Sequence, residues 1–170
     1  MIDLQKLILI SGVCGVGKST ICEYINNQRL LKDYAIFDID VLENINNYDE
    51  TTYNFFYENA IKNAIPLSEN KNIIIGTCIN PSDLEKINIP KEIESYINIL
   101  ITCSDEILKR RLKARDKNRN CSSDEFIEGQ ISYQQYLLNH IELYQFHIDN
   151  TSDTIENISN KLVDYIERRL

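Results

Sequence analysis

The sequence is poor in several residue types that mark particular classes of protein. Its 170 residues include no tryptophan, one methionine, three prolines and five glycines. No apolar run approaches the roughly 20 residues that a membrane-spanning helix needs, so we expect no contact with a membrane. The first residues show neither a basic region nor a small-residue cleavage site. We therefore expect no secretory signal peptide and a cytoplasmic location.

Positive charge is also scarce. Eighteen lysines and arginines stand against 26 acidic residues, which gives a net charge of −8. A protein that grips nucleic acid through its phosphates normally has the opposite balance, so nucleic acid is not an expected partner. The five cysteines are odd in number and include no C-x-x-C pair, which is typical of reduced thiols. We expect most of them to pack as small core residues.

Apolar runs alternate with helical patterns along the whole chain. The runs are continuous rather than alternating, which predicts parallel strands buried on both faces. Strands are predicted over residues 6–11, 34–40, 72–77, 96–102 and 145–149. Helices are predicted over residues 19–28, 53–64, 105–116, 124–144 and 153–169, with Asp49 or Thr51 capping the second, which ends before Pro66. The length suits a single α/β domain over residues 1–170.

Three of the five glycines fall within the six residues that follow the first predicted strand. The stretch fits the pattern G-x-x-x-x-G-K-[ST] and lies between a strand and a helix. Glycines let successive N–H groups point at one anion, and the following helix adds the positive end of its dipole. The pattern predicts a nucleoside triphosphate site. Gly12, Val13, Cys14, Gly15, Val16 and Gly17 would form the loop, with Lys18 at the β/γ-phosphates, Ser19 on Mg²⁺ and Thr20 at the α-phosphate.

Two large classes of nucleotide-binding protein fit poorly. The base-reading N-K-x-D element of G proteins is missing, since the segment "NKNI" lacks the aspartate and precedes a strand. Motor and assembly ATPases usually have a strand that ends in Asp-Glu, whereas the third predicted strand here ends in Gly76 and Thr77. The small size and the early P-loop favour a small-molecule kinase.

Three further features accompany the P-loop. The second predicted strand ends in "FDID", with Asp38 and Asp40. Arg111 and Arg115 lie four residues apart on one predicted helix, with Arg119 just beyond it. The turn after the fifth predicted strand contains polar residues, in the segment "HIDNTSDTIENI". With these features the chain resembles the nucleoside/nucleotide-kinase-like P-loop kinases, a group that includes adenylate, shikimate and gluconate kinases.

The resemblance implies a fold, two cofactors and a set of roles. The fold would be a three-layer α/β/α sandwich around a five-stranded parallel sheet of order 2-3-1-4-5, with a short lid near residues 116–123. The cofactors would be ATP and Mg²⁺. Asp38 would support Mg²⁺ and Asp40 would orient and deprotonate the acceptor. The catalytic set would be Lys18, Asp40 and Arg115. Adenine would be bound by stacking on Arg111 and by contacts to Asn150 and Thr151. Arg115 would reach the transferring phosphate, and Arg119, just beyond the pair, would belong to the same cofactor-binding set.

Simpler interpretations remain open for each of these features. One aspartate could only cap a helix beginning near Val41, and any single arginine could be solvated. Thr151 and Ser152 could only cap the last helix. Tyr48, Tyr53, Phe55, Phe56 and Tyr57 could stack on a nucleobase or belong to the core. Tyr133, Gln134, Gln135 and Tyr136 could form an acceptor wall or a polar helix face.

The acceptor side lacks the residues that hold a second phosphate. No arginine occurs between Arg29 and Arg110, whereas nucleoside monophosphate kinases usually place arginines there. We therefore expect an ATP- and Mg²⁺-dependent kinase that phosphorylates a hydroxyl of a nucleoside or similar neutral alcohol, as a monomer or homodimer. An antibiotic or sugar kinase of the same fold is an alternative. A regulatory ATPase with little transfer activity is another, although Asp38, Asp40 and Arg115 argue against it.

Overall fold

Strand β1 (Gln5–Ser11) occupies the centre of a five-stranded sheet in the computed structural model, which describes residues 4–169. The other strands are β2 (Tyr34–Asp38), β3 (Asn72–Thr77), β4 (Ile93–Thr102) and β5 (Phe146–Asp149). All pairings are parallel, in the order β2-β3-β1-β4-β5. The predicted α/β class and strand order are confirmed. The predicted domain limits, residues 1 and 170, lie outside the described residues.

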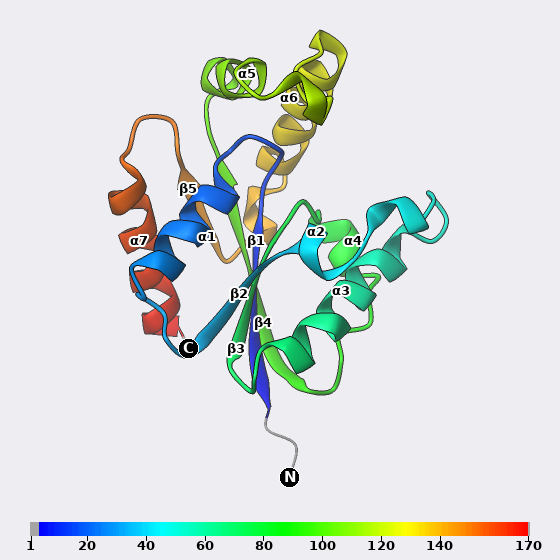
Figure 1. Ribbon diagram of the computed structural model, residues 1–170, viewed down its shortest axis with the longest axis vertical. Helices are drawn as coiled ribbons and strands as arrows, with labels where there is room; N and C mark the ends of the chain where they lie inside the picture. The colour runs from blue at the N-terminus through cyan, green and yellow to red at the C-terminus, as the bar shows by residue number, and fades with distance from the viewer. Residues whose placement is uncertain (1–3, 170) are drawn as a thin grey trace.

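Helices cover both faces of this sheet, as Figure 1 shows. Helices α1 (Lys18–Asn27) and α7 (Ile155–Arg169) lie on one face, and α3 (Tyr53–Leu67) lies on the other. Side chains alternate along β1. Ile8 and Ile10 therefore pack in the core that includes buried residues of α1 and α7, while Leu7 and Leu9 pack in the core that includes those of α3. This alternation explains why the strand reads as a continuous apolar run.

The remaining helices gather toward the carboxyl ends of the strands or on the α3 side. They are α2 (Ile39–Leu42), α4 (Pro81–Leu84), α5 (Asp105–Lys113) and α6 (Asp124–Leu138), with 3₁₀ turns η1 (Ile45–Asn47), η2 (Lys117–Arg119) and η3 (Ile141–Leu143). Helix α5 and the start of α6 stand beyond the carboxyl end of the sheet, close to the turn between β1 and α1 (Figure 1). No helix within residues 4–169 is long and apolar enough to cross a bilayer.

The second strand is shorter than predicted, and this changes the setting of Asp40. The strand was expected to reach residue 40, but it ends at Asp38. The Asp38 carboxylate accepts the N–H of Asp40 and caps α2, so the chain turns into a helix at this point. Asp40 therefore lies in the first turn of α2.

Other helix limits also differ from the prediction. Helix α3 continues through Pro66 to Leu67. Proline has no N–H to donate to the carbonyl four residues earlier, and this loss is tolerated because that carbonyl lies near the exposed end of the helix. Its N-cap residue is Thr52 rather than Asp49 or Thr51. Helix α6 ends at Leu138 instead of residue 144. Helix α7 begins at Ile155, after Thr154, whose hydroxyl accepts the N–H of Asn157.

Candidate nucleotide and acceptor site

The glycine-rich segment forms the turn from β1 into α1. Gly17 is the N-cap residue of α1 with a φ of 103°. A Cβ at Gly17 would lie 2.6 Å from Nδ2 of Asn150, so only glycine permits this close approach. Lys18 bends back over the loop, and its Nζ donates to the carbonyls of Gly12 (2.6 Å) and Val13 (2.9 Å). The ammonium group thus lies at the loop whose N–H groups would bind phosphate.

Two distant segments hold the end of this loop. The carbonyl oxygen of Val16 accepts hydrogen bonds from Nδ2 of Asn150 (2.8 Å) and from Nη1 of Arg111 (3.2 Å). Nη2 of Arg111 also donates to the carbonyl of Asn150, at 3.1 Å. Both bonds of Arg111 use N–H groups in the plane of its guanidinium, which leaves the flat face of the guanidinium available for stacking. This arrangement is compatible with the predicted role of Arg111 beside adenine.

The two side chains predicted to ligate Mg²⁺ are in direct contact. Oγ of Ser19 donates to Oδ2 of Asp38 at 3.0 Å. Hydroxyl and carboxylate oxygens are hard ligands that suit Mg²⁺, which usually keeps several waters and phosphate oxygens as well. Within residues 4–169, no three His, Cys, Asp or Glu side chains form a cluster that could hold a metal. The pair therefore fits an ion that a nucleotide helps to coordinate.

Asp40 lies beside this pair and differs from Asp38 in its electrostatic setting. Partial burial raises the pKa of Asp40, the negative charge of Asp38 raises it further, and the ammonium of Lys18 lowers it. A carboxylate with a raised pKa is a stronger base. The setting is the one that the predicted base role of Asp40 requires. The carboxylate of Asp38 caps α2 and also contacts Ser19. Helix capping is therefore not its single role.

The three lid-side arginines reach different places. Arg111 contacts the end of the P-loop, as described above. Nη1 of Arg115 donates to Sγ of Cys14, inside the P-loop, at 2.8 Å. Arg119 lies in η2, within the predicted lid. Arg115 and Arg119 both line the cavity that contains Asp38 and Asp40.

Two cavities meet at the P-loop and share Gly15, Gly17, Thr20 and Arg115. The smaller one has a volume of about 390 Å³ and is also lined by Arg111, Asn150, Asp153 and Ile155. The larger one has a volume of about 650 Å³ and contains Lys18, Ser19, Asp38 and Asp40. The arrangement offers two adjoining spaces at the loop, as a reaction between two bound molecules needs.

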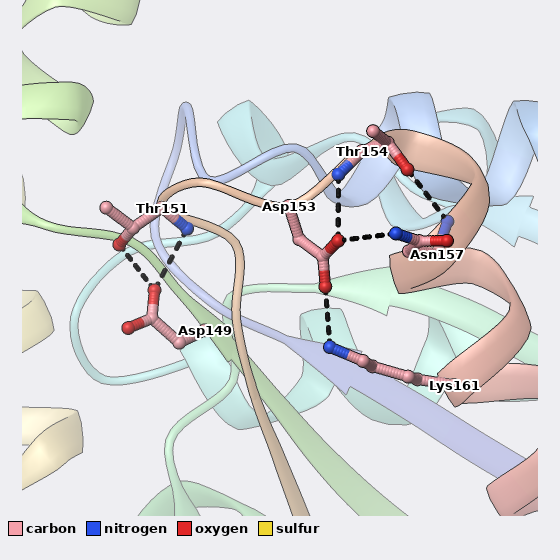
Figure 2. A network of polar contacts seen from close by, with 6 residues as sticks. All are labelled: Asp149, Thr151, Asp153, Thr154, Asn157 and Lys161. Atoms are coloured by element: carbon pink, nitrogen blue, oxygen red, sulfur yellow. Dashed lines mark hydrogen bonds and ion pairs between the residues drawn. The ribbon is translucent and has the colours of Figure 1, made fainter.

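The turn after β5 places its polar residues differently from the prediction. Asn150 is buried and lines the smaller cavity. The hydroxyl of Thr151 donates to Asp149 and accepts the N–H of Ser104, and Thr151 does not line that cavity. Asp153 does line it, held by Thr154, Asn157 and Lys161 (Figure 2). Sequence reasoning missed Asp153, because it was predicted to be the first residue of the last helix and not part of the turn.

The aromatic residues of α3 serve two purposes. Phe56 and Tyr57 are 2% and 4% exposed and belong to the core, yet both also line the larger cavity together with Tyr53. The ring centroids of Tyr53 and Tyr57 lie 5.2 Å apart in an edge-on arrangement. Phe55 is 53% exposed and does not line the cavity. Phe56 and Tyr57 therefore belong to the core and also border the cavity, whereas Phe55 does neither.

Helix α6 contacts three loops through side chains on neighbouring turns. Oε1 of Gln130 accepts the N–H of Cys14 in the P-loop at 2.9 Å. The hydroxyl of Tyr133 donates to the carbonyl of Cys78 after β3 at 2.6 Å. Gln134 bonds both the N–H and the carbonyl of Cys103, after β4. No sequence pattern had indicated the Gln130 contact.

Three of the five cysteines are less buried than the expected core role requires. Cys22 and Cys103 are buried, as expected. Cys14, Cys78 and Cys121 are partly exposed and line the larger cavity. Cys14 and Cys121 also pack against the core from this position, whereas Cys78 belongs to neither core cluster.

Comparisons with known proteins agree with this geometry. The family model described as AAA domain matches residues 8–132. A guanylate kinase from Malacoplasma penetrans (strain HF-2) is 31% identical over 184 residues, covering 92% of this chain and 90% of that protein.

Solved structures show the same fold at low identity. Shikimate kinase from Bacteroides thetaiotaomicron superposes with a TM-score of 0.65 at 17% identity, covering 95% of this chain and 98% of that one. A gluconokinase from Sinorhizobium meliloti 1021 gives a TM-score of 0.63 at 14% identity, covering 98% of this chain and 93% of that one. With the matched family model and the 31% identical relative, the chain belongs to the AAA domain family and is a P-loop kinase of the nucleoside/nucleotide-kinase-like group.

Proposed function

We propose that this kinase transfers the γ-phosphate of ATP, with Mg²⁺, to a hydroxyl group of a small neutral acceptor. A nucleoside is the first choice. The observation that carries the proposal is the pair of cavities joined at the P-loop, one lined by Arg111 and Asn150 and the other by Asp38 and Asp40. ATP would occupy the smaller cavity with its base, and the acceptor would occupy the larger one.

The chain's own groups supply positioning and charge. Ser19 and Asp38 would hold Mg²⁺, which supplies charge neutralisation at the phosphates. Lys18 and Arg115 both line the larger cavity and would bind the transferred group, since phosphoryl transfer depends mainly on positioning and electrostatic stabilisation. Asp40 would accept the proton of the attacking hydroxyl, aided by its raised pKa.

The charge of the larger cavity favours a neutral acceptor. Among the described residues that line it, the cations are Lys18, Arg115 and Arg119, all from the P-loop or the segment after α5. The wall formed by α3 presents Tyr53, Phe56 and Tyr57 instead. Such a wall suits a flat ring or a polyol with hydroxyl partners, and it offers no cation for a second phosphate.

The named relatives suggest two other acceptors. The 31% identical relative is named a guanylate kinase, which raises a nucleoside monophosphate acceptor. Solved structures of similar fold include a gluconokinase and a sugar kinase from Janibacter, which raise a sugar acceptor. The lack of cations on the wall formed by α3 argues against the first, whereas the cavity's hydroxyl groups are compatible with the second.

An acceptor panel tests the proposal. Release of ADP from ATP would be measured with nucleosides, with GMP and other nucleoside monophosphates, with neutral sugars, and with the hydroxy acids gluconate and shikimate. We expect a nucleoside or another neutral alcohol to give the highest kcat/KM. A clear preference for GMP would overturn the neutral acceptor, and ADP release that no acceptor stimulates would overturn the kinase assignment in favour of a regulatory ATPase.

A further inference from the structure

We propose that Asp153 reads the base of the donor nucleotide and selects adenine over guanine. This inference rests on the proposed function, since it assigns the smaller cavity to the donor base. Asp153 lies in the turn between β5 and α7 and lines that cavity, with its side chain 23% exposed. Among the described residues that line the cavity, Asp153 is the only carboxylate.

The hydrogen bonds of Asp153 leave room for one more donor. Oδ1 accepts the N–H of Thr154 (3.0 Å) and Nδ2 of Asn157 (2.9 Å), as Figure 2 shows. Oδ2 accepts Nζ of Lys161 at 2.5 Å. A carboxylate has about four acceptor positions, two on each oxygen. Both positions on Oδ1 are thus filled, and a single position on Oδ2 remains.

One remaining acceptor suits adenine. The exocyclic N6 amino group of adenine donates hydrogen bonds, whereas guanine carries the O6 acceptor at the equivalent ring position. In the same pose, O6 of guanine would face a negative carboxylate without a donor between them. The N1–H and N2–H donors of guanine lie next to O6 on the same edge. They would meet the carboxylate only in a shifted pose and together would need two acceptor positions, which Asp153 does not offer.

The carboxylate is held ionised and fixed in direction. The hydrogen bond from Lys161 lowers the pKa of Asp153, and the bonds from Asn157 and the N–H of Thr154 lower it further. Lys161 is itself on α7 and so ties the carboxylate to a rigid helix. The neighbouring amide of Asn150 donates to Val16, which leaves Asp153 as the charged acceptor in the cavity.

Equilibrium binding tests the inference without requiring catalysis. Binding of ATP, GTP and purine riboside triphosphate, which lacks the N6 amino group, would be measured by titration calorimetry. We expect ATP to bind the natural protein about 10- to 150-fold more tightly than either of the others, the range for a hydrogen bond to a charged group. Equal binding of the three nucleotides would overturn the inference.

Variants separate base recognition from a structural role. Asp153→Asn gives the side chain an amide that donates to O6, so the ATP preference over GTP should fall at least tenfold. A loss of equal size for all three nucleotides, or none for any, would contradict base reading. Asp164→Asn removes an exposed charge from α7, which follows the turn of Asp153, and should leave the preference unchanged.

A second variant covers the case in which Asp153→Asn does not fold. Lys161→Met keeps the carboxylate but frees a second acceptor position on Oδ2, so GTP should gain relative to ATP. An unchanged ratio would overturn the oxygen accounting. Base-selective binding without acceptor-dependent turnover would contradict the proposed function alone, whereas turnover that uses ATP and GTP equally would contradict this inference alone.

Discussion

The hydroxyl of Ser19 lies 3.0 Å from Oδ2 of Asp38, which joins the first turn of α1 to the end of β2. The other oxygen of Asp38 caps α2, where Asp40 lies. The proposed metal ligands and the proposed base are therefore parts of one hydrogen-bonded unit, although strand β3 separates β2 from β1. Substitutions in this unit should give distinct kinetic effects.

Asp40→Asn should lower acceptor-dependent turnover by about 10²–10⁴, the usual scale of general acid–base catalysis. ATP affinity should stay within a few-fold, because the residue faces the acceptor side. Asp38→Asn should instead raise the Mg²⁺ concentration needed for half activity. ATP titrations and turnover against Mg²⁺ would be measured for both variants. Normal turnover in Asp40→Asn with an inactive Asp38→Asn would reverse the two roles, and two active variants would refute both.

The pH dependence of Asp38→Asn gives an independent test of the base. The negative charge of Asp38 helps to raise the pKa of Asp40, so removing it should lower that pKa. Turnover that depends on ionised Asp40 rises with pH through this pKa. The acidic limb of kcat/KM should therefore move to lower pH in the variant, measured at saturating Mg²⁺. A limb that stays in place would assign it to another group.

Lys18→Ala should abolish phosphoryl transfer while the protein remains folded. The ammonium bonds only loop carbonyls and the thiol of Cys78, so no core contact is lost. Removing one such electrostatic group costs about 10²–10³ in rate. Turnover and thermal unfolding would be compared with those of the natural protein. Retention of more than a tenth of the activity would refute the role of Lys18.

Arg115→Lys should impair turnover nearly as much as Arg115→Ala. Lysine keeps the charge but lacks the two-pronged geometry that binds phosphate oxygens and the planar group that now contacts Cys14. Steady-state kinetics of the two variants would be compared. If lysine restored the natural rate, Arg115 would act only through its charge.

His147 should make the folded protein more stable above its ordinary pKa than below it. Burial lowers the pKa of His147 from an ordinary value of 6.5, and Oγ1 of Thr102 lies 2.8 Å from Nε2 of the ring. The unfolded chain then binds more protons just below pH 6.5, so stability falls as pH decreases through that value. Denaturant unfolding at a series of pH values would show this slope. His147→Gln should remove it, whereas His140→Gln should keep it.

Local features of the site were predictable from the sequence because residue type restricts the backbone geometry at each position. The glycines allow the positive φ angles of the P-loop, and Lys18 and Ser19 follow in fixed order. The strand order came from the resemblance rather than from periodicity. The end of β2 was predicted two residues too far along the chain. The strand stops where the carboxylate of Asp38 accepts the N–H of Asp40, and a pattern of apolar residues does not reveal that bond.

Contacts between distant parts of the chain could not be predicted in the same way. Gln130 and Asn150 contact the P-loop across 116 and 134 residues. No local pattern marks Gln130, and the resemblance placed Asn150 at adenine without indicating its bond to Val16. Asp153 was hidden for a related reason, since acidic residues are common at the start of helices. Such residues are found only once the fold brings their loops to the same edge of the sheet.

The attachment of α6 has a mechanical consequence for the proposed lid. Gln130, Tyr133 and Gln134 tie this helix to the P-loop and to the ends of β3 and β4. A swing that carried α6 along would break all of these bonds at once. The hinge of the lid must therefore lie before Gln130. Residues 116–123 would move while the part of α6 from Gln130 onward stays in place. The shape of the P-loop would then be the same before and after the lid closes, and capture of the nucleotide would not have to wait for that closure.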